Sequence, residues 1–366
     1  MSEKRTLQQF YKKYSIKADH AGALFDSIVA RAAHAQDLTA QQAKQAMVLL
    51  MSGSLSEVQI AGFLSAMHSK GEKVGEIAAF AEIMRAFAPT IFASHPSKIR
   101  IIDSCGTGGG TVQTFNISTV ATFVLAAAGL HVAKHGNRAI TSLAGSADVL
   151  SELGVTLDLP PRRVGACVKK VGIGFLFAPH FHRSTRFVQP VRKQLPHKTF
   201  FNILGPLTNP ARPPYQVVGV YAPELTKTVA EALKKLGTRR AMVVHGLSDT
   251  KGECLDEISL LGPTTVTELK GGALRTYTFD PRKYGYRYCK KSDIAGGSAQ
   301  ENARILKNIL TGKDKGPRRD VVVLNAAAGL IVGGKARTFA SAISLAHEVI
   351  NNGTAFDKVQ KLIRFT

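Results

Sequence analysis

A change of sequence pattern at Pro96 constrains the fold of this 366-residue chain more than any other feature. Beyond it, short apolar runs rich in β-branched residues alternate with stretches of helical periodicity. Strands and helices that alternate in this way are typical of an α/β domain with a largely parallel sheet. The expected strands are 98–102, 131–134, 174–177, 216–221 and 241–244, and the expected helices are 117–129, 226–236, 302–310, 320–330 and 339–350.

The chain before Pro96 has a helical pattern only, because its apolar side chains recur three or four positions apart. Helix starts are marked by Thr39 and by Ser54 or Ser56, all suitable N-caps. We therefore expect a small helical domain over residues 1–95 and a large α/β domain with a central, mostly parallel sheet over residues 96–366.

Composition excludes several classes of protein. With 45% apolar and 20% charged residues, the chain is not intrinsically disordered. No uncharged apolar run reaches the roughly 18 residues that a membrane helix needs. The first residues are too polar for a secretory signal. Four scattered cysteines, none at Cys-x-x-Cys spacing, argue against a zinc site or a disulfide framework. We expect a cytoplasmic protein with free thiols and no membrane partner.

The charge balance is unusual, because 48 Lys and Arg against 26 Asp and Glu give a net charge of +22. Such an excess indicates polyanionic partners, which include nucleic acid, acidic membranes and phosphorylated substrates. Within the basic group 282–291, the alternation of Tyr284, Tyr286 and Tyr288 would place three rings on one face of a strand. Cations with stacking rings suit single-stranded nucleic acid. The alternative interpretation is a solvated basic face.

Two glycine-rich turns follow expected strands. The first is DSCGTGGG at 103–110, followed by TFNIST at 114–119, and the second is KHGNRA at 134–139, followed by Ser142 and Ser146. Glycine lets backbone N–H groups approach a phosphate, and the helix that follows offers its positive N-terminus. Two anion-binding turns side by side suit a ligand with phosphate at both ends.

Other nucleotide motifs do not fit. Thr111 stands where the dinucleotide fingerprint needs glycine. The spacing of Gly329, Gly334 and Lys335 resembles a P-loop, but Ala336 lacks the magnesium-binding hydroxyl, and the preceding residues have a helical pattern.

Three further features could take part in phosphate chemistry. The adjacent carboxylates Asp256 and Glu257 are hard oxygen ligands suited to Mg²⁺, unless they are simply exposed on the surface. Arg192 could bind a carboxylate through two hydrogen bonds or could be a solvated surface residue. His182 by itself is more often a packing residue than a ligand.

Taken together, these motifs resemble the anthranilate phosphoribosyltransferase family, whose fold class also includes pyrimidine nucleoside phosphorylases. The resemblance runs from about residue 20 to the C-terminus. The motifs that carry it are GTGG at 106–109, TFNIST at 114–119, KHGNRA at 134–139, GSADVL at 145–150, FAPHFH at 177–182, PVRKQL at 190–195, FNILGPLTNP at 201–210 and LDEIS at 255–259.

The resemblance implies an activity and a domain arrangement. The enzyme would transfer the 5-phosphoribosyl group from phosphoribosyl pyrophosphate to the amine of anthranilate and release pyrophosphate, a step of tryptophan biosynthesis. It implies a homodimer, a Mg²⁺ requirement, and a segment at about 187–212 that packs back on the helical domain. Two alternatives remain: a paralogue that binds nucleic acid through its basic surface, and a phosphoribosyltransferase with another aromatic acceptor.

The resemblance also implies site residues, with no residue acting as a nucleophile and Lys134 acting electrostatically. The implied phosphoribosyl-pyrophosphate ligands are Gly106, Gly109, Gly110, Thr114, Asn116, Ile117, Ser118, Thr119, Lys134, His135, Gly136, Asn137, Arg138, Ser142 and Ser146. The implied anthranilate ligands are Gly106, Asn137, His135, His182 and Arg192. The implied Mg²⁺ ligands are Ser118, Asp256 and Glu257.

The chain departs from the family pattern near this site. Gly110 replaces the aspartate of the usual GTGGD, and Thr111 replaces the glycine that follows it. The stretch 245–255 is several residues longer than usual, and its Asp249 or Glu253 could supply the missing carboxylate.

Overall fold

The computed structural model describes residues 3–94, 96, 99–139 and 143–366. The chain divides into two compact units. The helical unit comprises Met1–Pro89 and His182–Thr208, and the α/β unit comprises Thr90–Phe181 and Asn209–Thr366. The second segment of the helical unit overlaps the stretch 187–212 that the resemblance assigns to the helical domain.

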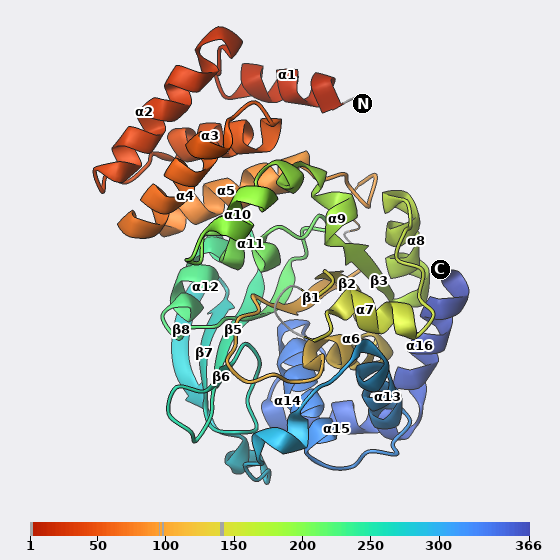
Figure 1. Ribbon diagram of the computed structural model, residues 1–366. Helices are drawn as coiled ribbons and strands as arrows, with labels where there is room; N and C mark the ends of the chain where they lie inside the picture. The colour runs from red at the N-terminus through yellow and green to blue at the C-terminus, as the bar shows by residue number, and fades with distance from the viewer. Residues whose placement is uncertain (1–2, 95, 97–98, 140–142) are drawn as a thin grey trace. The chain divides into compact units, whose positions relative to one another are not determined.

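The helical unit is built from short helices. They are α1 (Glu3–Lys13), α2 (Ala21–Ala33), α3 (Ala40–Ser52), α4 (Glu57–Lys70), α5 (Val74–Phe87), α10 (Gln189–Gln194) and α11 (Phe201–Leu207) (Figure 1). Thr39 and Ser56 cap α3 and α4 through reciprocal bonds with Gln42 and Gln59, which confirms Ser56 rather than Ser54 as the second cap.

Aromatic packing joins the two segments of the helical unit. The ring of Phe200, from the second segment, lies 4.4 Å from that of Phe80 and 6.1 Å from that of Phe63, centroid to centroid. All three rings are fully buried. Gly53 ends α3 at φ 75°, and a Cβ there would lie 2.6 Å from the ring of Phe187. Only glycine allows both this conformation and this close approach.

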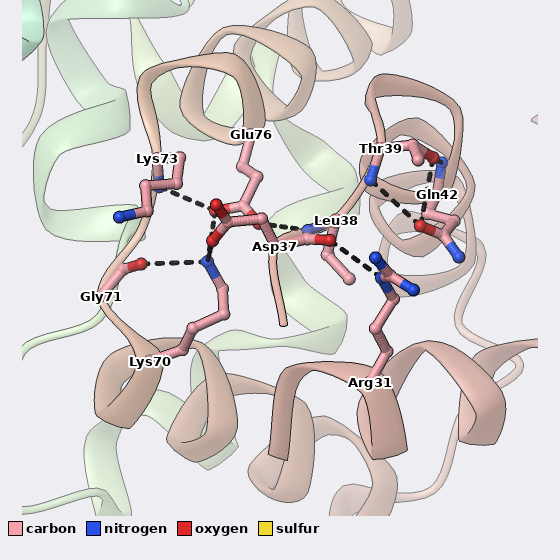
Figure 2. Close-up of polar contacts among 9 residues, drawn as sticks. All are labelled: Arg31, Asp37, Leu38, Thr39, Gln42, Lys70, Gly71, Lys73 and Glu76. Carbon is pink, nitrogen blue, oxygen red and sulfur yellow. Dashed lines mark hydrogen bonds and ion pairs between the residues drawn. The ribbon is translucent and has the colours of Figure 1, made fainter. Parts of the chain in front are cut away.

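A buried ion pair fixes the loops of the helical unit (Figure 2). Glu76 accepts hydrogen bonds from the backbone N–H groups of Leu38 and Lys73, both at 2.7 Å, and from Lys70 Nζ at 2.9 Å. Lys70 Nζ also donates to Asp37 Oδ1 and to the carbonyl oxygen of Gly71. The Lys70 and Glu76 side chains are each only 1% exposed. Every charge in this cluster therefore has an opposite charge or a polar backbone group beside it.

The α/β unit contains, within its described residues, a sheet of eight strands. They are β1 (Ile101–Gly106), β2 (His131–Gly136), β3 (Ile173–Phe177), β4 (Tyr215–Gly219), β5 (Arg240–Leu247), β6 (Cys254–Leu255), β7 (Thr264–Lys270) and β8 (Ala273–Phe279). The order is β3-β2-β1-β4-β5-β7-β8, with β6 beside β5. The strands β1 to β5 are mutually parallel; β6 and β7 pair antiparallel with β5, and β8 pairs antiparallel with β7. A mostly parallel sheet is thus confirmed.

Helices cover both faces of this sheet. They are α6 (Ile117–Ala127), α7 (Ser146–Glu152), α8 (Pro161–Val171), α9 (Ala178–Phe181), α12 (Leu225–Lys235), α13 (Ala299–Leu310), α14 (Pro317–Val332), α15 (Phe339–Asn351) and α16 (Thr354–Phe365) (Figure 1). Ile102 and Val132 pack in one core with α6 and α14, whereas Ile101 and Ala133 pack in another core with α8. Alternate strand residues thus point to opposite faces.

One sequence prediction about this unit is wrong. Tyr284, Tyr286 and Tyr288 do not alternate along a strand, because 281–284 is a 3₁₀ helix and the next residues are irregular. All three side chains make contacts within the protein. Tyr284 stacks on Phe279, Tyr286 contacts His347 through its hydroxyl, and Tyr288 donates to Asp280. The expected row of three rings on one face of a strand is therefore not present in these described residues.

Candidate active site

The glycine-rich turns lie at one edge of the sheet. β1, β2, β4 and β5 are parallel neighbours, so their carboxyl ends meet there. The first turn follows β1 and the second follows β2, while Asp256 and Glu257 follow β6. The carboxyl edge of an open α/β sheet is where such folds bind ligands.

The first turn, residues 103–110, packs against Asp256. The backbone N–H of Gly108 donates to Asp256 Oδ2 at 2.8 Å. Gly108 and Gly109 adopt φ of 71° and 82°, which favours glycine. A Cβ on Gly106 would collide with the Asp256 carboxylate. Glycine at these positions therefore brings backbone amides and a carboxylate together.

Lys134 is the central cation of this edge. Its side chain is buried, and Nζ donates to the carbonyl oxygen of Ser104 at 2.9 Å and to Ser118 Oγ at 3.5 Å. Ser118 lies in the first turn of α6, and its backbone N–H donates to Glu257 Oε1 at 3.0 Å. Lys134, Ser118 and Glu257 thus form one connected polar group.

The surroundings of Asp256 and Glu257 disfavour the ionised form of both carboxyl groups. Desolvation raises the pKa of Asp256 despite the hydrogen bond from Gly108. Desolvation and the neighbouring Asp256 charge raise the pKa of Glu257 to about 8, although Lys134 opposes the shift. A bound cation would relieve this cost, because opposite charge favours the ionised form.

The second turn is organised by Asp148, which sequence reasoning missed. Asp148 Oδ2 accepts the backbone N–H groups of Ala139 and Gly145, both at 2.9 Å, and Oδ1 pairs with Arg138 at 2.8 Å. The Arg138 guanidinium therefore already has a carboxylate partner. The signal that could have revealed Asp148 is its position three residues after Gly145, at the start of α7.

Asn137 and Ser146 lie in the same turn. The carbonyl oxygen of Asn137 accepts the Ala147 N–H at 3.1 Å and Ser146 Oγ at 3.4 Å. The Asn137 residue itself is exposed. Ser142 lies outside the described residues.

Several implied ligands at the start of α6 have other partners. Asn116 does not cap the helix. Its side chain donates to the carbonyl oxygen of Ala144 and accepts from Asn302, both at 3.0 Å. Thr114 pairs with Ala295 in an isolated bridge. Among the remaining implied ligands here, Ile117 and Thr119 are fully buried.

Asp103 and Asn209 also support the site and were not identified as functional from the sequence. Asp103 is fully buried; it accepts the backbone N–H of His135 at 3.3 Å and Asn209 Nδ2 at 2.8 Å. Asn209 Nδ2 also donates to the carbonyl oxygen of Ala133. Asp103 therefore fixes the end of β2 just before Gly136. This role could have been suspected from the sequence, because Asp103 directly follows the expected strand 98–102.

Arg192 and His182 belong to the helical unit. The Arg192 guanidinium lies 4.8 Å from the centroid of the Phe201 ring, and Nη1 donates to Gln189 Oε1 at 3.2 Å. Desolvation lowers the pKa of Arg192 to about 10. Within the described part of the chain, no carboxylate pairs with it. His182 is buried.

The longer stretch before Asp256 does not leave Glu253 free to replace a missing carboxylate. Glu253 Oε1 pairs with Lys291 at 2.7 Å, and Ser248 Oγ donates to Oε2 at 3.3 Å. Asp249 accepts from Ser248 as well. Over the described ranges, no group of three or more His, Cys, Asp or Glu side chains could hold a metal ion. Any cation here would need other oxygen ligands besides Asp256 and Glu257.

In the part of the chain that the structure covers, no helix has the length and apolar character needed to cross a membrane.

Comparisons with known proteins agree with this geometry. The sequence model for the a/b domain of the glycosyl transferase family matches residues 98–356, and the model for the helical bundle domain of that family matches residues 17–88. Anthranilate phosphoribosyltransferase of Moorella thermoacetica is 48% identical over 328 residues, which are 90% of this chain and 94% of the relative. The enzyme of Symbiobacterium thermophilum is 47% identical over 340 residues, 93% and 97% of the two chains.

Solved structures agree as well. The crystal structure of anthranilate phosphoribosyltransferase from Thermus thermophilus is similar with a TM-score of 0.85 and 40% identity, and covers 92% of this chain and 98% of that one. The Saccharomyces cerevisiae enzyme in complex with PRPP and Mg has a TM-score of 0.83 and 27% identity, and covers 94% and 99%. The chain therefore belongs to the anthranilate phosphoribosyltransferase family, within the glycosyl transferases.

Proposed function

We propose that this protein transfers the 5-phosphoribosyl group of phosphoribosyl pyrophosphate to the amine of anthranilate and releases pyrophosphate. The observation that carries the proposal is the connected group of Lys134, Ser118 and Glu257 beside the glycine turn, which Gly108 ties to Asp256. This group offers backbone amides and a cation to a pyrophosphate, and carboxylates to the metal that accompanies it.

In the reaction, a nitrogen–carbon bond forms at the anomeric carbon, the bond to the pyrophosphate oxygen breaks, and the amine releases a proton. Such transfers develop oxocarbenium character at the sugar. The residues of this chain would act by position and charge. The amides of Gly109 and Gly110, with that of Gly108 once it leaves Asp256, would hold the pyrophosphate, and Lys134 would stabilise the charge that develops on the leaving group. No side chain needs to act as a nucleophile.

We assign the phosphoribosyl pyrophosphate ligands to the α/β unit. Gly106, Gly109, Lys134 and Asn137 lie on the two turns at the carboxyl edge of the sheet, where a phosphate would be expected. The hydrogen bonds of Asn116 and Arg138 to other parts of the unit favour a supporting role for these two side chains.

Mg²⁺ fits the residues present. Asp256 and Glu257 are hard oxygen donors with raised pKa values, and Ser118 adds a hydroxyl beside them. Two protein carboxylates suit an ion that keeps its other positions for water and substrate phosphates. When bound, Mg²⁺ would supply positive charge that neutralises the pyrophosphate.

Arg192 is the residue that we propose for the carboxylate of anthranilate. Its guanidinium lies half-buried against the Phe201 ring, burial lowers its pKa, and no described carboxylate neutralises it. A planar carboxylate matches the two parallel N–H groups of a guanidinium. We include Gly106, Asn137, His135 and His182 among the residues that contact anthranilate.

The test is turnover by the purified protein with phosphoribosyl pyrophosphate, Mg²⁺ and anthranilate, followed by the loss of anthranilate fluorescence. We expect activity that requires all three components. Arg192→Ala should raise the KM for anthranilate by about 30- to 200-fold, while the KM for phosphoribosyl pyrophosphate changes little. Arg186→Ala, in the same unit, is the matched control. If folded wild-type protein shows no turnover across a wide Mg²⁺ range, the proposed function is wrong.

We further propose a cytoplasmic homodimer. The four cysteines are free thiols, which favours a reducing compartment. The dimer rests on the resemblance to the family, and sedimentation equilibrium of the full chain would test it.

A further inference from the structure

The glycine turn has a second attachment besides Asp256. Thr111 Oγ1 accepts the backbone N–H of Cys254 at 2.8 Å and donates to the carbonyl oxygen of Gly252 at 3.3 Å. The backbone N–H groups of Thr111 and Val112 both donate to the carbonyl oxygen of Cys254, at 3.0 and 3.3 Å. Thr111 is exposed, so water could satisfy its hydroxyl, and the need to pair a buried polar group does not account for these bonds.

Contacts continue between the two attachments. A Cβ built on Gly110 would lie 3.1 Å from the carbonyl oxygen of Cys254 and 3.3 Å from Leu255 Cα. The turn therefore lies flat against the chain that leads into Asp256. Gly108 is held at one end by Asp256, and Thr111 is held at the other.

The two attachments differ in chemistry. The one at Asp256 joins a carboxylate, for which a cation would compete, to a backbone N–H, for which a pyrophosphate would compete. The one at Thr111 uses a neutral hydroxyl and backbone groups, which no charged ligand displaces. Its partner segment is itself ordered, because Ser248 and Glu253 bond to each other, and Lys291 pairs with Glu253.

We propose that Thr111 is a positioning residue for phosphoribosyl pyrophosphate, an inference that rests on the proposed function. When Asp256 binds the metal and releases the Gly108 N–H, the Thr111 hydroxyl still holds the amides of 108–110 beside the acidic pair. The substrate then meets an ordered turn and does not bear the cost of ordering it.

The test compares Thr111→Val, which keeps the shape and removes the hydroxyl, with Thr111→Ser, which keeps the hydroxyl. We expect Thr111→Val to raise the KM for phosphoribosyl pyrophosphate about five- to tenfold, with kcat within about twofold of wild type. Thr111→Ser should restore the wild-type KM. Thr278→Val, an exposed threonine of β8, is the matched control.

Hydrogen exchange provides a readout that does not depend on turnover. The Cys254 amide should exchange faster in Thr111→Val than in wild type or Thr111→Ser, because its acceptor is lost. An unchanged KM for Thr111→Val overturns the proposal, and so does an equal rise in Thr111→Ser. A wild-type protein without turnover would instead refute the proposed function, and unchanged exchange at Cys254 would still refute the role of the hydroxyl.

Discussion

The two units differ in the partners that they give to acidic side chains shielded from water. In the helical unit, Glu76 has Lys70 and two backbone N–H groups around it, and the side chains of this pair are 1% exposed (Figure 2). In the α/β unit, Asp256 and Glu257 lie side by side, and their pKa values are raised. A charge whose partners are all supplied by the protein stabilises the fold. Two adjacent carboxylates that lack enough positive charge around them can instead bind a cation that arrives with a ligand.

The largest expected effect comes from the acidic pair. Asp256→Asn and Glu257→Gln keep the shape and remove one charge each, so we expect kcat/KM to fall about 100- to 1000-fold. Stability without metal should stay equal or rise, because each change removes charge repulsion. Activity assays and thermal unfolding in EDTA measure the two effects. Full activity in both variants would show that the pair is ordinary surface charge.

The next effect concerns the buried pair of the helical unit. Lys70→Met leaves Glu76 without its cation, and should lower the free energy of unfolding by about 3 to 5 kcal/mol. Urea denaturation measures it. Lys44→Met, which breaks the more exposed pair with Glu82, should cost less than about 1 kcal/mol.

The double variant Lys70→Met with Glu76→Gln completes this test. It should recover part of the loss, because no unpaired charge then stays buried. Equal stability of Lys70→Met and Lys44→Met would contradict the contrast between the two units.

The smallest effect is a pH dependence at Glu257. Its raised pKa, about 8, means that a proton competes with Mg²⁺ below that value. The apparent affinity for Mg²⁺ should therefore rise with pH, by about fivefold from pH 7 to pH 8. Calorimetric titration of Mg²⁺ in the presence of pyrophosphate measures it.

The same shift affects stability without metal. A carboxyl group with a raised folded pKa contributes stability that is fully present below its unfolded pKa and is lost as pH rises through about 8. Thermal unfolding in EDTA should show this decline between pH 5 and pH 9. It should flatten in Glu257→Gln, whereas an identical slope would assign the decline to another group.

Much of the fold could be predicted from local pattern. The five parallel strands were expected, as were α6, α12, α13, α14 and α15, and observed boundaries differ by a few residues. The helical pattern around Gly329 is confirmed, since α14 runs to Val332 and excludes a P-loop. The helices α7 to α11, the short strand β6, the antiparallel hairpin of β7 and β8, and the last helix, α16, were not predicted.

The candidate site was only partly predictable. Glycine, lysine and carboxylate motifs marked Gly106, Lys134 and Asp256, because these residue types suit phosphate and metal at strand ends. The supporting roles of Asp103, Asp148 and Asn209 were missed, since each depends on a partner from another segment.

The sequence alone determined the strand–helix alternation, the helical N-terminal region and the residues able to bind phosphate, because periodicity and turn chemistry act over a few neighbouring positions. Only the tertiary structure decided which charges find partners. Gly108 and Asp256 are 148 residues apart in the chain, and Thr111 and Cys254 are 143 apart. These pairs meet because the order of the strands brings β1 and β6 to the same edge, and no local pattern encodes that order.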